Sequence, residues 1–183
     1  MLFTANEVDL RKVASILKNG GVVAIPTETV YGLAANALDE NAVMKIFKAK
    51  GRPSDNPLIV HISTVDDMEK YSFPNKTAYN LAGKFWPGPL TMILPKKNNI
   101  PSVVSGGLDT VALRLPSHEV ARKIIDYSGV PLAAPSANIS GRPSPTRAEH
   151  VISDFGDKID GVVDGGFCKF GVESTVISLC GKK

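Results

Sequence analysis

The sequence predicts an α/β fold, with a single domain over residues 1–183 in which helices flank a mixed sheet. Short apolar runs alternate with segments of helical spacing along the whole chain. Glycines and prolines separate these segments. The length fits one globular domain, and no repeat or long linker divides the chain.

The first third of the chain predicts a helix, a buried strand and a second helix. Residues 7–19 place apolar side chains near helical spacing and end at an Asn-Gly-Gly signal. The apolar run 22–25 stops at a proline, which indicates a strand that leads into the polar loop 27–32. Asp39 is a suitable cap for a helix that runs to about Lys50.

The rest of the chain continues this alternation. Further helices are predicted over residues 66–71, 77–85, 119–127 and 147–155. Further strands are predicted over residues 58–62, 90–94, 111–115, 132–134, 161–164 and 175–179. Helices and strands therefore interleave to the end of the sequence.

Composition indicates a soluble protein without a membrane segment. Apolar residues make up 43% and charged residues 21% of the chain. The N-terminal residues lack the basic and apolar regions of a signal peptide, so a cytoplasmic location is expected. The net charge of +3 is compatible with either an anionic substrate or RNA.

Cysteine and histidine usage predicts no protein-ligated metal. Cys168 and Cys180 are too few for a disulfide framework and do not form a CxxC motif, so they are interpreted as buried or incidental thiols. His61, His118 and His150 are far apart and lack zinc-ligand spacing.

Two polar loops are candidate sites for an anionic ligand. Lys50 and Arg52 leave a helix end and enter a proline-rich loop, where they could bind phosphate or lie in a solvated turn. Ser136, Asn138 and Ser144 follow an apolar run and could orient a nucleotide or form ordinary turns. Neither loop matches a Walker or GxGxxG motif, so any ATP site is of another kind.

Two polar side chains lie in predicted strands. Arg114 interrupts an apolar run, so it should meet an anion, either a structural carboxylate or a substrate carboxylate. His61 ends another strand and is interpreted equally well as a hydrogen-bonded core residue or as a site residue.

Six ordered motifs give the chain a resemblance to the YrdC/TsaC family of threonylcarbamoyl-AMP synthases over residues 7–179. The motifs occupy residues 26–33, 50–58, 86–91, 111–116, 134–141 and 173–177. The resemblance implies a twisted open sheet with a concave basic face. It also implies a nucleotidyltransferase that joins L-threonine, bicarbonate and ATP into threonylcarbamoyl-AMP and releases pyrophosphate. Magnesium should accompany the ATP phosphates.

The resemblance also assigns site residues. Positions that match the threonine side are Thr29, His61, Arg114, Ala134 and Ser174, and Thr27 is expected to border the same pocket. Positions that match the ATP side are Lys50, Arg52, Asn56, Thr110, Ser136, Asn138 and Ser144. Lys50 and Arg52 are the predicted catalytic residues, because charge must be neutralised as pyrophosphate leaves.

In the family, the product serves threonylcarbamoyladenosine modification of tRNA through downstream transfer proteins. The sequence ends shortly after its last predicted strand and is interpreted as the short single-domain type, although a cut form of the longer branch is the alternative. That branch adds a linker over the nucleotide and a second domain. Two alternative functions are a module that binds tRNA or double-stranded RNA and a paralogue with a different acceptor.

Overall fold

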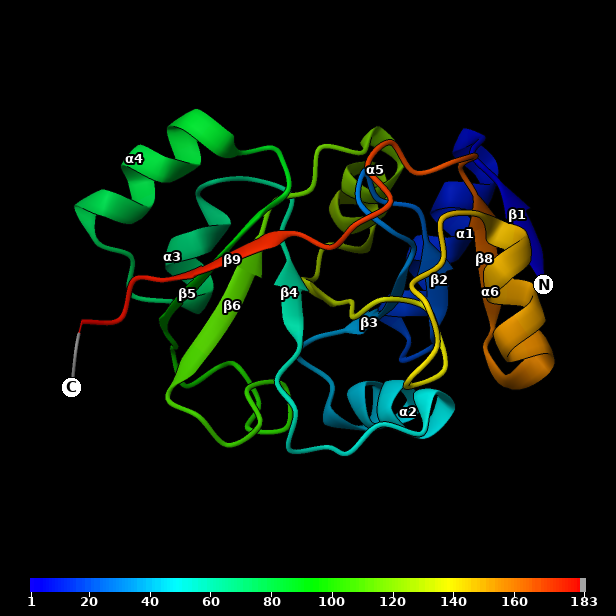
Figure 1. Cartoon of the computed structure of the whole chain (residues 1–183), viewed down its shortest axis with the longest axis horizontal. Coiled ribbons are helices and arrows are strands. Elements are labelled where there is room, and N and C mark those ends of the chain that lie inside the picture. Colours follow the sequence, from blue (N-terminus) through cyan, green and yellow to red (C-terminus); the bar gives the residue numbers. More distant parts are fainter. Residues whose placement is uncertain (182–183) are drawn as a thin grey trace.

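A computed structural model describes residues 1–181 and has one nine-stranded mixed sheet flanked by helices (Figure 1). The predicted α/β class is confirmed. Every predicted helix and strand is present, with its ends within one residue of the expected bounds. The predicted domain also includes Lys182 and Lys183, which lie outside the described residues.

The sheet combines parallel and antiparallel pairs in the order β1-β8-β2-β3-β7-β4-β6-β5-β9. The parallel pairs are β1–β8, β2–β8, β4–β6 and β5–β9. The strands are β1 (Leu2–Thr4), β2 (Val23–Ile25), β3 (Gly32–Asn36), β4 (Ile59–His61), β5 (Leu90–Pro95), β6 (Thr110–Arg114), β7 (Leu132–Ala133), β8 (Gly161–Asp164) and β9 (Thr175–Ser178).

Helix α2 (Glu40–Lys50) begins and ends where its local sequence favours it. Oδ1 of Asp39 accepts hydrogen bonds from the first turn of α2, and Gly51 ends that helix with a positive φ of 61°. The helices are α1 (Glu7–Lys18), α2 (Glu40–Lys50), α3 (Asp67–Tyr71), α4 (Lys76–Phe85), α5 (Glu119–Ser128), α6 (Ala148–Phe155) and the short 3-10 helix η1 (Gly156–Lys158).

Strands β1 and β3 are not predicted by the sequence pattern. Strand β3 carries Leu33, Ala34 and Ala35 and lacks the β-branched and aromatic residues that are typical of strands. It nevertheless pairs with β2 on one side and β7 on the other, and its first four residues are buried. Tertiary pairing therefore determines this strand.

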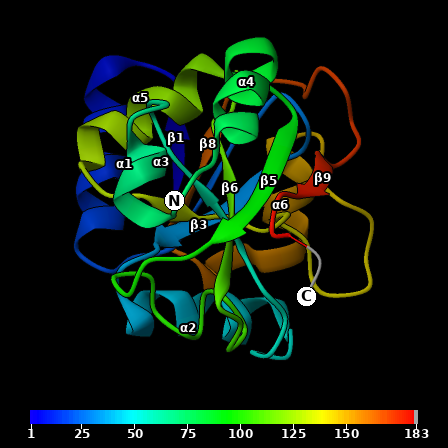
Figure 2. The ribbon, with the colours of Figure 1, turned by 90° about the vertical axis from the view of Figure 1, so that its left-hand side faces the viewer.

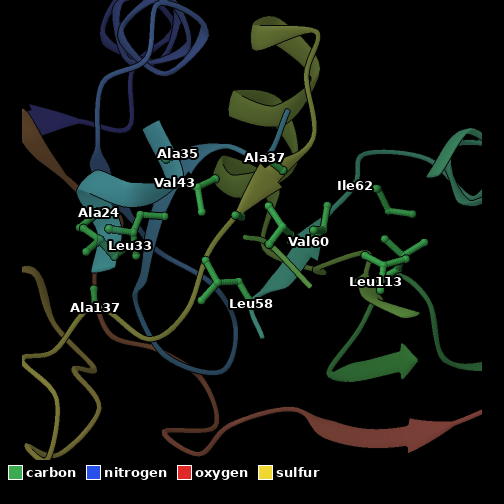
Figure 3. Close-up of a cluster of buried hydrophobic side chains, with 14 of the residues drawn as sticks. Ala24, Leu33, Ala35, Ala37, Val43, Leu58, Val60, Ile62, Leu113 and Ala137 are labelled. Carbon is green, nitrogen blue, oxygen red and sulfur yellow. The ribbon is translucent and has the colours of Figure 1, made fainter. Parts of the chain in front are cut away.

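Two apolar cores cover the two faces of the sheet. Helices α1 and α5 pack on one face, and Figure 2 shows them on the side of the sheet opposite α6. The larger core holds alternate residues of the central strands, such as Leu33 and Ala35 of β3 and Val60 of β4, together with residues of α2 (Figure 3). This core fixes the central strands, and β4 and β6 carry the site described next.

Candidate active site

A pocket of about 180 Å³ lies at the carboxyl ends of the parallel strands β4 and β6. His61 and Arg114 end these strands and are register partners. Within β4 the side chains alternate, since Val60 joins the core while Ile59 and His61 line the pocket. Ligands of open α/β sheets favour this edge.

The structure brings all six residues assigned to the threonine side together in this pocket. They come from the loop after β2, the ends of β4, β6 and β7, and the residue before β9. The six lining residues are Thr27, Thr29, His61, Arg114, Ala134 and Ser174. The volume is below the roughly 300–1,000 Å³ of drug-sized pockets, so it suits a small ligand.

A segment of residues 165–174, which we call the strap, ends at the pocket, where Glu173 and Ser174 belong to the lining. In Figure 1 it runs from β8 toward β9 across the width of the sheet. Its backbone donates hydrogen bonds of 3.0 Å from Phe170 to the carbonyl of Glu28 and from Gly171 to that of Thr29. The hydroxyl groups of Ser174 and of Thr91 in β5 form a hydrogen bond, with 2.7 Å between their oxygens. The strap therefore ties the threonine-rich loop to the far edge of the sheet.

The loop after β2 is shaped by the hydroxyl of Thr27. Its Oγ1 donates to the carbonyl of Val30 at 2.6 Å and accepts from the backbone nitrogens of Thr29 and Val30. Oγ1 of Thr27 also lies 2.9 Å from Oγ1 of Thr29. Both threonines are buried, so the loop presents a fixed pair of hydroxyl groups.

His61 is held neutral in the wall of the pocket. Only 2% of the residue is exposed, and neither ring nitrogen has a hydrogen-bond partner among residues 1–181. Burial and the positive charge of Arg114 lower the pKa of His61 to about 3. A neutral imidazole retains one nitrogen that can accept a hydrogen bond from a ligand.

Arg114 meets a protein carboxylate that the sequence left unidentified. Its Nη2 donates a hydrogen bond of 2.8 Å to Oε1 of Glu28, and both side chains are buried. Burial raises the pKa of Glu28, but the charge and hydrogen bond of Arg114, followed by hydrogen bonds from the backbone of Glu28 and Ser117, keep this pKa below its usual value. Arg114 also lines the pocket, so it can contact a ligand while it remains paired with Glu28.

Two residues assigned to the ATP side, Arg52 and Ser136, line the same pocket. The Arg52 guanidinium is half-buried and donates from Nη2 to the carbonyl of Pro57 at 3.2 Å. Its Nε is buried without a hydrogen-bond partner in the described chain, and burial lowers its pKa. Arg52 thus brings a cation to the threonine-side residues.

Lys50 lies behind the pocket wall. Its Nζ donates to the carbonyls of Ser136 at 2.5 Å and Asn138 at 2.6 Å, and only 2% of the residue is exposed. Burial, followed by the charge of Arg52, lowers the pKa of Lys50 to about 8. Lys50 therefore fixes the loop that carries Ser136.

The remaining ATP-side residues lie outside the lining of this pocket. Asn138 is buried and donates from Nδ2 to the carbonyls of Ile139 and Arg142. Ser144 hydrogen bonds to Glu173, which does line the pocket. Asn56 is exposed in the loop after α2, and Thr110 is half-buried at the opposite end of β6 from Arg114.

The chain that carries these six motifs and this pocket matches the model of a known protein family. The model of the Sua5/YciO/YrdC family, described as "Telomere recombination", matches residues 15–183. The chain belongs to this family. The resemblance drawn from the sequence is confirmed.

Members of the Sua5/YciO/YrdC family with high similarity include longer proteins. A Pyrococcus abyssi protein named threonylcarbamoyl-AMP synthase is 58% identical over 175 residues, which are 94% of this chain and 51% of the relative. A Bacillus subtilis protein of the same name is 52% identical over 177 residues, which are 96% of this chain and 51% of the relative. The chain therefore spans about half the length of these curated relatives.

A solved structure has the same fold. The crystal structure of P. abyssi Sua5 complexed with L-threonine superimposes with a TM-score of 0.97 and 54% sequence identity. The match covers 99% of this chain and 55% of that chain. The nine-stranded sheet described above is thus the fold of this family.

Three site residues were missed by the sequence analysis. Glu28 pairs with Arg114, Glu173 is the acidic residue in the pocket lining, and Gly32 brings the β3 backbone close to β7. A Cβ on Gly32 would lie 3.3 Å from that of Ala134, inside the lining. The sequence did contain a signal for Glu28. This residue lies between Thr27 and Thr29, which were both assigned to the site, and a buried arginine requires an acidic partner.

The described part of the chain has no cluster of three or more metal-ligating side chains. Cys168 and Cys180 are free thiols, and burial raises the pKa of Cys168 to about 11. Among residues 1–181, no helix has the length and apolar character needed to cross a membrane.

Proposed function

We propose that this domain synthesises threonylcarbamoyl-AMP and pyrophosphate from L-threonine, bicarbonate and ATP, for threonylcarbamoyladenosine modification of tRNA. The observation that carries the proposal is the convergence of all six threonine-side residues on one small pocket. The names of the two relatives and the L-threonine bound to P. abyssi Sua5 support the same substrate. We propose residues 1–183 as the single domain that carries this site.

The pocket offers a complementary group for each part of L-threonine. Arg114 supplies a cation for the carboxylate. The hydroxyl groups of Thr29 and Ser174 supply donors and acceptors, and the neutral ring of His61 supplies an acceptor. The side chain of leucine lacks a hydrogen-bonding group for these partners, so leucine should bind more weakly than threonine.

ATP, with its magnesium ion as part of the substrate, would lie beside the pocket. Arg52 reaches the lining and would neutralise phosphate charge, while Lys50 adds positive charge from behind the Ser136 carbonyl. Asn56, Thr110, Asn138 and Ser144 complete the proposed ATP side. Ser144 is linked to the pocket through Glu173.

The proposed reaction is a nucleotidyl transfer. The threonine amine attacks the carbon of bicarbonate, and loss of water gives a carbamate. One carbamate oxygen then forms a bond to the α-phosphorus of ATP, and the bond to pyrophosphate breaks. The protein contributes positioning and charge neutralisation, because two anions must approach each other. The product would pass to downstream transfer proteins that act on tRNA in the cytoplasm.

Pyrophosphate release by the purified chain tests the proposal. The protein is incubated with magnesium and ATP, with and without L-threonine and bicarbonate, and the nucleotide product is identified by mass spectrometry. Threonylcarbamoyl-AMP is expected only when both co-substrates are present. Folded protein that makes no nucleotide product, yet binds RNA with a steep salt dependence, would support the RNA-binding module instead. A product formed only with another amino acid would identify a paralogue with a different acceptor.

A further inference from the structure

Glu28 contacts the pocket arginine from outside the pocket. Its Oε1 lies 2.8 Å from Nη2 of Arg114, and the two side chains expose only 5% and 4% of their surfaces. Arg114 is a lining residue of the pocket, whereas Glu28 is not. Glu28 therefore contacts Arg114 without lining the space that a ligand would occupy.

The guanidinium of Arg114 is held at two of its three nitrogens. Nη2 donates to Glu28, and Nε donates to the carbonyl of Gly88 at 3.4 Å. The backbone nitrogen of Gly88 donates in turn to the carbonyl of Leu115 at 2.8 Å, which fixes that loop on β6. Nη1 has no hydrogen-bond partner among residues 1–181, so its two N–H groups remain for a ligand.

Glu28 is itself fixed in place. Its carbonyl accepts a hydrogen bond of 3.0 Å from the strap nitrogen of Phe170. Its second carboxylate oxygen, Oε2, is buried and has no hydrogen-bond partner within the described residues. The arginine is therefore the side chain that stabilises this buried carboxylate, and the two groups must be placed together.

We propose that Glu28 is a positioning residue, which holds Arg114 so that Nη1 faces the pocket and receives the carboxylate of the α-amino acid substrate. The inference rests on the proposed function, because it takes the ligand to be L-threonine. A long arginine side chain that is already fixed loses little rotamer freedom when the substrate binds. Glu28 therefore favours substrate binding without contacting the substrate.

Two substitutions of Glu28 separate positioning from general damage to the fold. Glu28→Leu keeps much of the volume but removes the acceptor, whereas Glu28→Gln keeps an oxygen that can accept from Nη2. For Glu28→Leu we expect the Kd and KM for L-threonine to rise by about tenfold or more, with the KM for ATP unchanged. Glu28→Gln should recover most of this loss. Glu119→Leu, which removes an exposed acid paired with Lys123, is the matched control.

A folded Glu28→Leu protein with unchanged affinity for L-threonine would overturn the inference. So would equal increases in the KM values for threonine and ATP, because a positioning role acts on one substrate. Calorimetry on the unsubstituted protein separates this result from failure of the proposed function. If that protein binds no L-threonine, both proposals are wrong.

A measurement on the unsubstituted protein covers the case in which Glu28→Leu does not fold. The protein is labelled with ¹⁵N-arginine, and the Arg114 side-chain signals are assigned from their absence in Arg114→Lys. Addition of L-threonine should shift the Nη1 signals and leave the Nη2 signals close to their original positions. Equal shifts at both nitrogens, or no shift at either, would overturn the inference.

Discussion

Lys50 donates a hydrogen bond of 2.6 Å to the carbonyl of Asn138, although the two residues are 88 positions apart. A second bond of 2.5 Å reaches the carbonyl of Ser136. The lysine is the last residue of α2, and these carbonyls belong to the loop after β7. The end of a helix therefore determines the position of a pocket wall.

Replacement of Lys50 by methionine should lower the free energy of unfolding by about 2–4 kcal/mol, because two carbonyls would lose their donor. The loop around Ser136 would also lose its fixed position, so adenylate formation should fall strongly. Urea denaturation measures the first effect, and pyrophosphate release measures the second. The control is Lys48→Met, an exposed residue of the same turn, which should change stability by about 0.5 kcal/mol or less. Equal stability of Lys50→Met and the unsubstituted protein would contradict this expectation.

The same lysine should make stability depend on pH. Its pKa is lowered from 10.5 to about 8 in the folded protein, so between these values the unfolded chain binds a proton that the folded protein does not. The contribution of Lys50 to the free energy of unfolding should therefore rise with pH from 8 to 10.5. Tyr31 and Cys168 act in the opposite direction, because their pKa values are raised on folding.

The contribution of Lys50 can be isolated by comparing two proteins. Urea denaturation at pH 8 and pH 10 gives the change in unfolding free energy for the unsubstituted protein and for Lys50→Met. The change should be more positive in the unsubstituted protein, since only that protein retains the lysine. Identical changes in the two proteins would mean that Lys50 has an ordinary pKa in the folded state.

The helices and most strands could be predicted from the sequence because their signals are local. The Asp39 cap and the Gly51 stop bound α2 without reference to the rest of the chain. Strand β3 lacks such a signal, since its alanines favour a strand only through pairing with β2 and β7. Residues 2–4 likewise become a strand by pairing with β8, more than 150 residues away.

The site was predictable in part. The apolar surroundings of Arg114 required an anion, but its local sequence could not identify Glu28, which lies 86 positions away. The charge of Lys50 favoured a phosphate contact, whereas the structure provides two backbone carbonyls from a distant loop. In both cases the residue type indicates a need for a partner, and only the fold determines which partner lies within reach.

Arg52→Ala should weaken use of ATP more than binding of threonine. Arg52 reaches the pocket but is held mainly through the Pro57 carbonyl, so its loss leaves the Arg114 pair in place. A charged hydrogen bond contributes about 1.5–3 kcal/mol, which predicts a ten- to hundredfold increase in the KM for ATP. Steady-state kinetics and threonine calorimetry without nucleotide measure the two effects.

The matched control for Arg52→Ala is Arg11→Ala, which removes an exposed arginine that pairs with Glu7 on α1. This control should leave both KM values unchanged, because exposed pairs contribute little. Unchanged turnover in folded Arg52→Ala would remove Arg52 from the proposed ATP side.

His61→Phe should make the protein less sensitive to acid. The folded protein excludes a proton from His61 down to a pKa of about 3, while the unfolded chain takes up that proton below about pH 6.5. The stability that depends on neutral His61 is therefore complete above pH 6.5 and is lost as the pH falls toward 3. Phenylalanine keeps an aromatic ring of similar size but has no titrating group.

Urea denaturation at pH 7 and pH 4.5 tests this expectation. The unsubstituted protein should lose more unfolding free energy across this range than His61→Phe, and the exposed-site control His150→Phe should lose as much as the unsubstituted protein. At pH 7 the affinity of His61→Phe for L-threonine should fall by about tenfold, because a neutral acceptor is lost from the pocket. Equal losses of stability in all three proteins would show that His61 titrates alike in the folded and unfolded states, which would contradict its burial without a hydrogen-bond partner.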